Sequence, residues 1–226
     1  MQTEHNLTYH KNVFWIPTIS ILTIWFVYFI EIKFGFNFNK LGILPRDFKG
    51  LRGILFSPFI HSNTSHLYNN SVPLFVLLAS LFYFYREVSI KVLLYGIFFS
   101  GLISWIIGRE SYHIGASGVI YLLFSFIFFS GIIRKHYRLI AMSLVIIFLY
   151  GSMIWLILPT EDRISWEGHL SGFIIGLLLS FIYKNKGITL EEYEFSTNEF
   201  DTLFDEKGNL IEDKEENKET IESSDV

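Results

Sequence analysis

A serine stands among small residues at the head of a long apolar run, in the stretch "HIGASGVIYLL" at residues 113–123. A serine hydroxyl is a weak nucleophile, and it reacts when a base lies within about 2.6–3.2 Å. The candidate base is His169, which opens another apolar run much later in the chain. The chain contains no cysteine, which excludes thiolate catalysis and thiolate-bound metals. No aspartate stands beside the histidine, so Ser117 and His169 predict acyl transfer by a serine–histidine dyad.

The stretch "HLYNN" at residues 66–70 supplies groups that could stabilise the reaction. Attack of a hydroxyl on an amide carbonyl creates an oxyanion, which needs hydrogen-bond donors already in place. The imidazole of His66 and the amide of Asn70 share a helix face at positions i and i+4. The backbone N–H of Ser117 is a third candidate donor, because the first N–H groups of a helix lack acceptors within it. Asn69 points about 100° away from Asn70 on an ideal helix, and we assign it a structural or lipid-facing role.

Small residues surround both the candidate nucleophile and the candidate base. Glycines flank the serine and let the backbone approach closely around the hydroxyl. In "GHLSGFIIG", the histidine shares a helix face with two later glycines, a small-xxx-small pattern that permits tight helix contact. One turn after the serine comes a tyrosine whose ring could pack on the imidazole. These supporting residues are Gly115, Gly118, Gly172, Gly176 and Tyr121.

The elements that must position these groups are membrane helices. The chain of 226 residues is 51% hydrophobic and 18% aromatic, with only 18% charged residues, which is typical of a membrane protein. A spanning helix needs about 17–25 mostly apolar residues, and six segments fit or nearly fit this length. The second, fourth and sixth segments run in the same direction, so the candidate groups that open them share one membrane face. We therefore predict an all-α membrane protein with six transmembrane helices, at about residues 13–34, 66–85, 90–107, 117–133, 139–158 and 168–183.

Charge is segregated along the chain. Residues 191–226 hold 14 Asp or Glu against 3 Lys or Arg, a net charge of −11, whereas residues 1–190 hold 8 against 15, a net charge of +7. This predicts a six-span membrane domain at 1–190 followed by an acidic, disordered tail at 191–226. The short loop "RKHYR" is strongly basic, and the loop at 159–167 is mainly acidic. Because basic loops stay inside, we predict a multi-pass protein of a bacterial cytoplasmic membrane with both termini and the tail in the cytoplasm.

Together, the motifs resemble those of the rhomboid intramembrane serine proteases, over roughly residues 13–184. "GASG" is similar to the family's G-x-S-G nucleophile motif, "HLYNN" to its H-x-x-x-N element, and "GHLSGFIIG" to its histidine-helix motif. Tyr121 and His61 also match positions of the family pattern. The resemblance implies a rhomboid-like bundle that cleaves single-span membrane proteins near the membrane surface.

The resemblance also implies that substrates enter between the second and fifth helices, under a mobile cap at residues 159–167. The first loop departs from the pattern. Bacterial members carry a Trp-Arg pair there, whereas this chain reads "PRDFKGLRGILFSPFIH" at residues 45–61, with no tryptophan. The shape of the first loop therefore does not follow from the resemblance.

Two classes of function remain open at this stage. The first is a serine endopeptidase, and the alternative is a catalytically silent rhomboid-like protein that binds membrane clients. The presence of both Ser117 and His169 favours the enzyme. A proton-relay transporter is disfavoured because no carboxylate lies in the middle of a span. The expected partners are transmembrane substrates and the lipid bilayer.

Metal and cofactor chemistry finds little support in the sequence. Four histidines could suggest zinc, but the chain has neither an H-E-x-x-H motif nor a cysteine. It also has no dinucleotide-binding or P-loop motif. We expect no metal, no cofactor and no nucleic-acid partner. Near the candidate site, the adjacent residues Arg109 and Glu110 are expected to pair with each other at the rim. The four histidines are His61, His66, His113 and His169.

Overall fold

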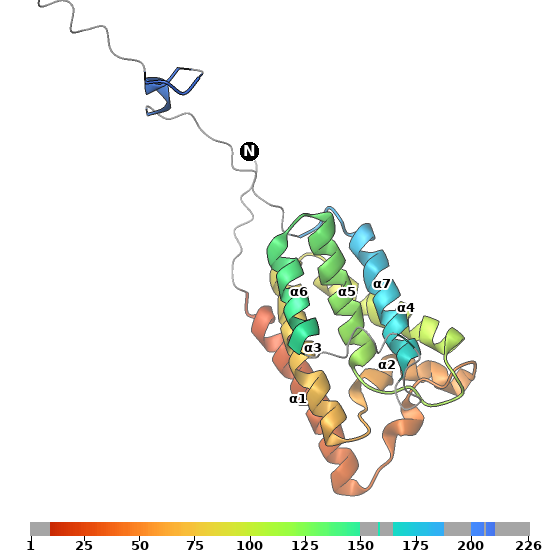
Figure 1. Ribbon diagram of the computed structural model, residues 1–226. Coiled ribbons are helices and arrows are strands. Elements are labelled where there is room, and N and C mark those ends of the chain that lie inside the picture. The colour runs from red at the N-terminus through yellow and green to blue at the C-terminus, as the bar shows by residue number, and fades with distance from the viewer. Residues whose placement is uncertain (1–9, 150–157, 159–164, 188–199, 206, 211–226) are drawn as a thin grey trace, which may run out of the picture. The chain divides into compact units, whose positions relative to one another are not determined.

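The computed structural model describes residues 10–149, 158, 165–187, 200–205 and 207–210. Within these residues the chain forms seven α-helices and several short 3-10 helices, and its β-structure consists of two isolated bridges (Figure 1). The prediction of an all-α fold is confirmed. The helices are α1 (Asn12–Phe34), α2 (Gly53–Phe56), α3 (Thr64–Phe84), α4 (Ser89–Ile107), α5 (Ser117–Ile133), α6 (Tyr137–Leu149) and α7 (Trp166–Ile182).

The chain divides into two compact units, Met1–Leu190 and Glu191–Val226. In the second unit the described residues form a 3-10 turn at Asp201–Leu203 and an isolated bridge between Phe204 and Leu210. The carboxylate of Asp205 accepts hydrogen bonds from the backbone N–H groups of Lys207 and Asn209, which closes this turn. The prediction of disorder concerns mainly residues of the tail that lie outside the described ones.

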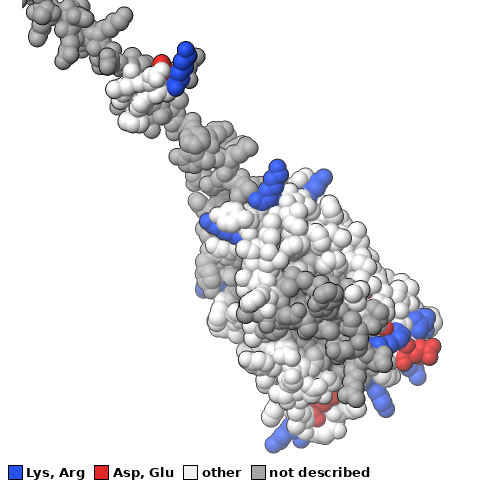
Figure 2. All heavy atoms as spheres, in the orientation of Figure 1, with Lys and Arg blue, Asp and Glu red and all other residues white. Residues whose placement is uncertain are grey.

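Three helices of the first unit, α1, α3 and α4, are long and apolar enough to cross a membrane, counted over the residues that the structure describes. The helices α5 and α7 are also apolar, and each has 17 residues, the lower end of the about 17–25 that a span needs. The far end of the predicted fifth span and most of the predicted cap lie outside the described residues. Figure 2 shows charged side chains near the two ends of this unit, and the described residues that are visible between them are mainly uncharged. The count of six spans stays a prediction.

Helix α5 lies at the centre of the bundle and packs against α3, α4, α6 and α7 (Figure 1). Its 17 residues include 11 buried ones, whereas α1 has 23 residues and buries only Pro17 and Ile24. A helix that is apolar all round is stable only where neighbours cover it or lipid surrounds it. Neighbouring helices cover α5, whereas the exposed apolar side chains of α1 are suited to contact with lipid.

The backbones of α5 and α7 approach each other closely at two glycines of α7. A Cβ atom added at Gly172 would overlap the carbonyl oxygen of Gly118, and one added at Gly176 would overlap that of Leu122. Two helices can come this close only where small residues face each other. The glycines of α7 therefore press the helix that carries His169 against the helix that begins at Ser117.

The first loop packs against the loop that joins α4 to α5. It consists of short helices at Phe38–Leu41, Phe48–Arg52, Gly53–Phe56 and Ser57–Phe59. Ile43 forms an isolated bridge with His113, and the carbonyl of Ser57 accepts a hydrogen bond of 2.9 Å from the N–H of Gly115. Arg46 donates through Nη1 to the carbonyl of Gly108 at 2.6 Å, at the carboxyl end of α4, where a cation is favourable. The loop thus fixes the backbone that leads to Ser117.

Candidate active site

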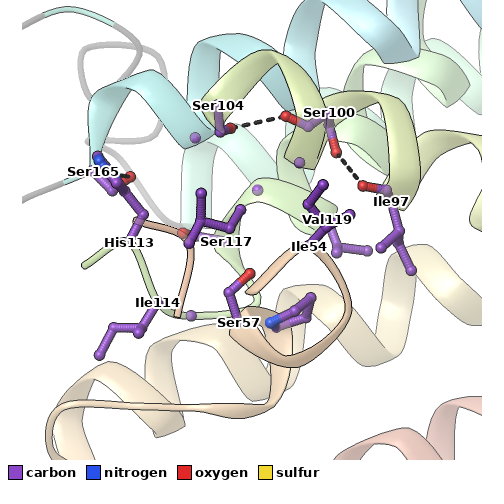
Figure 3. Close-up of a pocket in the computed structure, with 16 residues that line it drawn as sticks. Ile54, Ser57, Ile97, Ser100, Ser104, His113, Ile114, Ser117, Val119 and Ser165 are labelled. Carbon is purple, nitrogen blue, oxygen red and sulfur yellow. Dashed lines mark hydrogen bonds between the residues drawn. The ribbon is translucent and has the colours of Figure 1, made fainter. Parts of the chain in front are cut away.

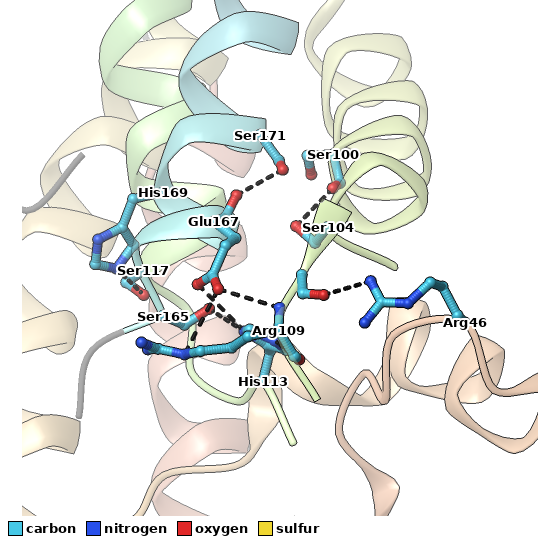
Figure 4. Close-up of polar contacts among 11 residues, drawn as sticks. Arg46, Ser100, Ser104, Arg109, His113, Ser117, Ser165, Glu167, His169 and Ser171 are labelled. Atoms are coloured by element: carbon cyan, nitrogen blue, oxygen red, sulfur yellow. Dashed lines mark hydrogen bonds and ion pairs between the residues drawn. The ribbon is translucent and has the colours of Figure 1, made fainter. Parts of the chain in front are cut away.

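The structure brings Ser117 and His169 together. Ser117 is the first residue of α5 and His169 lies in the first turn of α7, and Oγ of the serine is 2.8 Å from Nε2 of the histidine (Figure 4). His169 is buried, whereas Ser117 is only partly covered. The ring of Tyr121 stacks on the imidazole, with centroids 4.3 Å apart and planes inclined by 22°. The hydroxyl and the imidazole are thus at the distance that proton transfer requires, and the tyrosine limits rotation of the ring.

The side chains of His66 and Asn70 cover the backbone just before the serine. A Cβ atom added at Gly115 would stand 2.7 Å from Nε2 of His66 and 3.7 Å from Nδ2 of Asn70. The φ angle of Gly115 is +109°, which would strain any residue with a side chain. Glycine is therefore required here for two reasons, the backbone conformation and the room for the imidazole.

Asn70 and Asn69 point in different directions, as their positions on a helix require. Asn70 is buried, and its Nδ2 group finds no hydrogen-bond acceptor among the described residues. Asn69 is exposed. A buried donor without a partner costs about 1–3 kcal/mol, so a ligand that offers an acceptor at this point would recover that free energy. Asn70 is consequently a donor available to bind an oxygen atom beside Ser117.

His61 lies beneath the same segment and supports its conformation. It is almost fully buried, its ring centroid is 5.0 Å from that of His66, and its Nε2 accepts from the N–H of Ala116 at 3.4 Å. Burial, together with the neighbouring His66, lowers the pKa of His61 to about 3, so this imidazole is neutral near pH 7 and can accept. The N–H groups of Gly115 and Ala116 are both bonded within the protein. The next amide, that of Ser117, belongs to the first residue of α5, where the N–H groups of a helix have no acceptor within it.

A small cavity of about 40 Å³ lies beside Ser117 (Figure 3). Such a volume holds water, because one molecule needs only about 10–15 Å³. The hydroxyl of Ser104 donates to the carbonyl of Ser100 at 2.9 Å, which keeps its oxygen available as an acceptor. The cavity therefore offers polar contacts next to the serine. Its wall carries the hydroxyl groups of Ser57, Ser100, Ser104 and Ser165.

The predicted pair between Arg109 and Glu110 is wrong. Nε of Arg109 lies 3.5 Å from Glu167, and Glu110 lies 4.0 Å from Arg46 instead. The physical reason is burial: the side chain of Glu167 is 1% exposed, whereas that of Glu110 is 88% exposed. A buried carboxylate needs a compensating charge far more than an exposed one. Sequence reasoning missed Glu167, although its place in the first turn of a helix, where carboxylates are favoured, was a signal.

The comparisons with known proteins identify the family of the chain. Residues 49–186, more than half of the chain, match the family model described as the Rhomboid domain. The chain is 32% identical over 177 residues to the uncharacterized protein Rv1337 of Mycobacterium tuberculosis, which covers 72% of this chain and 71% of that protein. It is 28% identical over 204 residues to the uncharacterized protein ML1171 of Mycobacterium leprae, with 79% of each chain covered. The matched residues contain α3, α5 and α7 and begin after α1.

Proposed function

Because this chain belongs to the rhomboid family and is therefore an integral membrane protein, we propose that it is a serine endopeptidase that cleaves single-span membrane proteins near the membrane surface. The observation that carries the proposal is the distance of 2.8 Å between Oγ of Ser117 and Nε2 of His169, at the starts of two helices. Both groups of the proposed dyad are present, in contact, and beside an available amide donor.

The chemistry follows from the positions of these groups. His169 accepts the hydroxyl proton through Nε2 while Oγ of Ser117 attacks the carbonyl carbon of the scissile bond. The carbonyl oxygen becomes an oxyanion that receives hydrogen bonds from Asn70, His66 and the N–H of Ser117. The imidazolium then gives its proton to the leaving amine, and an ester forms on the serine. Water, activated by the same imidazole, hydrolyses this ester and restores both side chains.

The proposed arrangement in the membrane has six spans, with both termini in the cytoplasm of a bacterium. The starts of α3, α5 and α7, which carry the site, then lie near the opposite surface. The contact between Gly115 and His66, and that between Ser117 and His169, support a common level for these helix starts. A substrate would enter between α3 and α6, as the family resemblance implies, and its scissile bond would bind close to that surface.

Cleavage of a purified substrate tests the proposal against the alternative of silent client binding. We expect the protein in lipid vesicles to cut a single-span model substrate at one or a few bonds, located by mass spectrometry. The Ser117→Ala protein should bind the same substrate in a pull-down and leave it intact, since the hydroxyl is required for the ester but not for contact. Binding without cleavage by both proteins would support the silent client-binding protein and overturn the endopeptidase.

Substitution of Asn70 tests the proposed stabilisation of the oxyanion. Its hydrogen bond strengthens only as charge develops, so Asn70→Ala should lower kcat more than it raises KM. Loss of one such donor costs about 10²–10³ in rate in soluble serine proteases, and we expect a smaller loss here because His66 and the Ser117 amide share the oxyanion. Steady-state kinetics with the vesicle assay measures the effect.

Asn69→Ala is the matched control for this substitution, because it removes the same side chain from the exposed face of the same helix. It should leave kcat within about twofold of the unsubstituted protein. If Asn69→Ala abolishes cleavage and Asn70→Ala does not, the oxyanion does not bind at Asn70.

A further inference from the structure

A second cross-link joins the two segments that carry the proposed dyad. Nδ1 of His113 lies 2.5 Å from Oγ of Ser165, and the two residues are 52 positions apart in the chain, as Ser117 and His169 are (Figure 4). His113 stands four residues before Ser117, and Ser165 four residues before His169. The two Ser–His contacts are therefore successive cross-links between the same two segments, with serine and histidine exchanged.

The direction of this hydrogen bond follows from the second nitrogen of the ring. Nε2 of His113 lies 3.1 Å from the carbonyl oxygen of Arg109, and a carbonyl oxygen can only accept. Nε2 therefore carries the proton, and Nδ1 accepts from the hydroxyl of Ser165. Burial lowers the pKa of His113, which favours this neutral form. Both ring nitrogens are thus occupied, one by each segment.

An ion pair between Arg109 and the buried carboxylate of Glu167 reinforces the cross-link. The backbone N–H of Arg109 donates to Oε1 of Glu167 at 3.2 Å, and Nε of the same arginine is 3.5 Å from that carboxylate oxygen. Oε2 of Glu167 lies 3.9 Å from Nδ1 of His113, which is a packing contact and not an ion pair, because this nitrogen carries no proton when it accepts from Ser165. Every one of these contacts runs between the segment 109–113, which leads into Ser117, and the segment 165–167, which leads into His169.

The start of α7 depends on these contacts, because its own cap is missing. Ser165 occupies the N-cap position, where a serine hydroxyl ordinarily accepts from the N–H groups of the first turn. Here its side chain makes no capping hydrogen bond and contacts His113 instead. The first turn of α7, which includes His169, is therefore held by backbone hydrogen bonds to the carbonyl of Ser165 and, in place of a side-chain cap, by the contact with the neighbouring loop.

We propose that Arg109, His113, Ser165 and Glu167 form a positioning clamp that sets the distance between Ser117 and His169. None of the four exchanges a proton with the substrate. The effect of the clamp on cleavage rests on the proposed function, while its effect on the position of the His169 ring does not. Positioning matters because a displacement of about 1 Å in an active site can cost about 10²-fold in rate.

A pair of serine substitutions on the same segment tests the clamp. Ser165→Ala removes the cross-link, whereas Ser171→Ala removes a buried hydroxyl that donates to the carbonyl of Glu167 within α7. We expect Ser165→Ala to lower kcat about tenfold with KM nearly unchanged, and Ser171→Ala to change neither by more than about twofold. Ser165→Thr, which keeps the hydroxyl, should restore most of kcat. Equal kinetics for the two alanine variants would overturn the clamp.

Nuclear magnetic resonance of protein labelled with ¹⁵N-histidine supplies a measurement that does not need catalysis. The Nε2 signal of His169 is assigned by its loss in His169→Gln, and it reports the hydrogen bond to Ser117. This signal should move in Ser165→Ala and stay in place in Ser171→Ala. If the signal moves in Ser165→Ala while the unsubstituted protein cleaves nothing, the clamp stands and the proposed function fails. An unmoved signal in Ser165→Ala overturns the clamp, whatever the activity.

Two substitutions of His113 keep the test decisive should Ser165→Ala fail to fold. Asparagine places an oxygen near the position of Nδ1, and glutamine places its amide near that of Nε2. His113→Asn should therefore retain the contact with Ser165 and most of kcat, and His113→Gln should lose both. The opposite ranking of the two variants would overturn the clamp.

Discussion

Alanine at Ser117 or at His169 is expected to lower the cleavage rate by at least about 10³-fold, and the double substitution is expected to be no worse than either single one. The hydroxyl and the imidazole are 2.8 Å apart and would act as a unit, so loss of either group removes catalysis by the pair. Folding should be largely retained, because both side chains are at helix starts and neither bears the main packing of α5 on α7. Initial rates in lipid vesicles and thermal unfolding in detergent measure the two quantities.

Ser125→Ala is the matched control for the serine substitution. Ser125 is buried on the same helix, and its hydroxyl donates to the carbonyl of Phe173 on α7 at 2.7 Å, far along the helix from the site. Its loss should lower the free energy of unfolding by about 1 kcal/mol and leave cleavage nearly unchanged. A Ser117→Ala protein that cleaves at a large fraction of the original rate would show that another group is the nucleophile.

Valine at Gly172 is expected to reduce both stability and cleavage. Its side chain would overlap the carbonyl oxygen of Gly118 and crowd the N–H of Leu122, so α7 must move away from α5. Overpacking of this kind costs about 1–3 kcal/mol, and the same displacement lengthens the contact between Ser117 and His169. The thermal midpoint in detergent and kcat in vesicles should therefore fall together.

A substitution at the exposed position 178 of the same helix is the matched control. It tests the effect of a branched side chain without crowding between the helices. Leu178 is 50% exposed, so Leu178→Val introduces valine into α7 without touching α5. Its midpoint and rate should stay close to those of the unsubstituted protein. A Gly172→Val protein that behaves like Leu178→Val would mean that the glycine face does not set the distance between the two helices.

The parts of the fold that sequence could predict are those dictated by apolar runs. Helices α1, α3, α4, α5, α6 and α7 begin within two residues of the predicted spans. An apolar run bounded by polar loops leaves few choices for where a membrane helix starts. The family match confirms the recognition that the motifs suggested. The roles of Ser117, His169, Asn70 and His66 stay predictions, although the structure places these residues together.

The contacts that the sequence did not predict join residues far apart in the chain, and no periodic pattern of residues marks them. Arg109 is 58 residues from Glu167, and no rule of local spacing links them, so the adjacent Glu110 looked like the better partner. The hydrogen bond of Ser165 also has no local signal in the sequence, because it leaves the helix that the serine begins. The first loop, with its short helices, has no regular hydrophobic pattern, and its shape depends on the neighbours that it packs against.

The contact of Ser117 with a residue much later in the chain has a consequence for the synthesis of the protein. Ser117 leaves the ribosome 52 residues before His169, and at about 5–20 residues per second the interval lasts several seconds. During that time α5 is in place without α7, and the hydroxyl has no base. Under the proposed function, the nascent chain is thus inert toward the membrane proteins around it, its own earlier helices included. Activity then appears in one step, when the glycine face of α7 docks on α5.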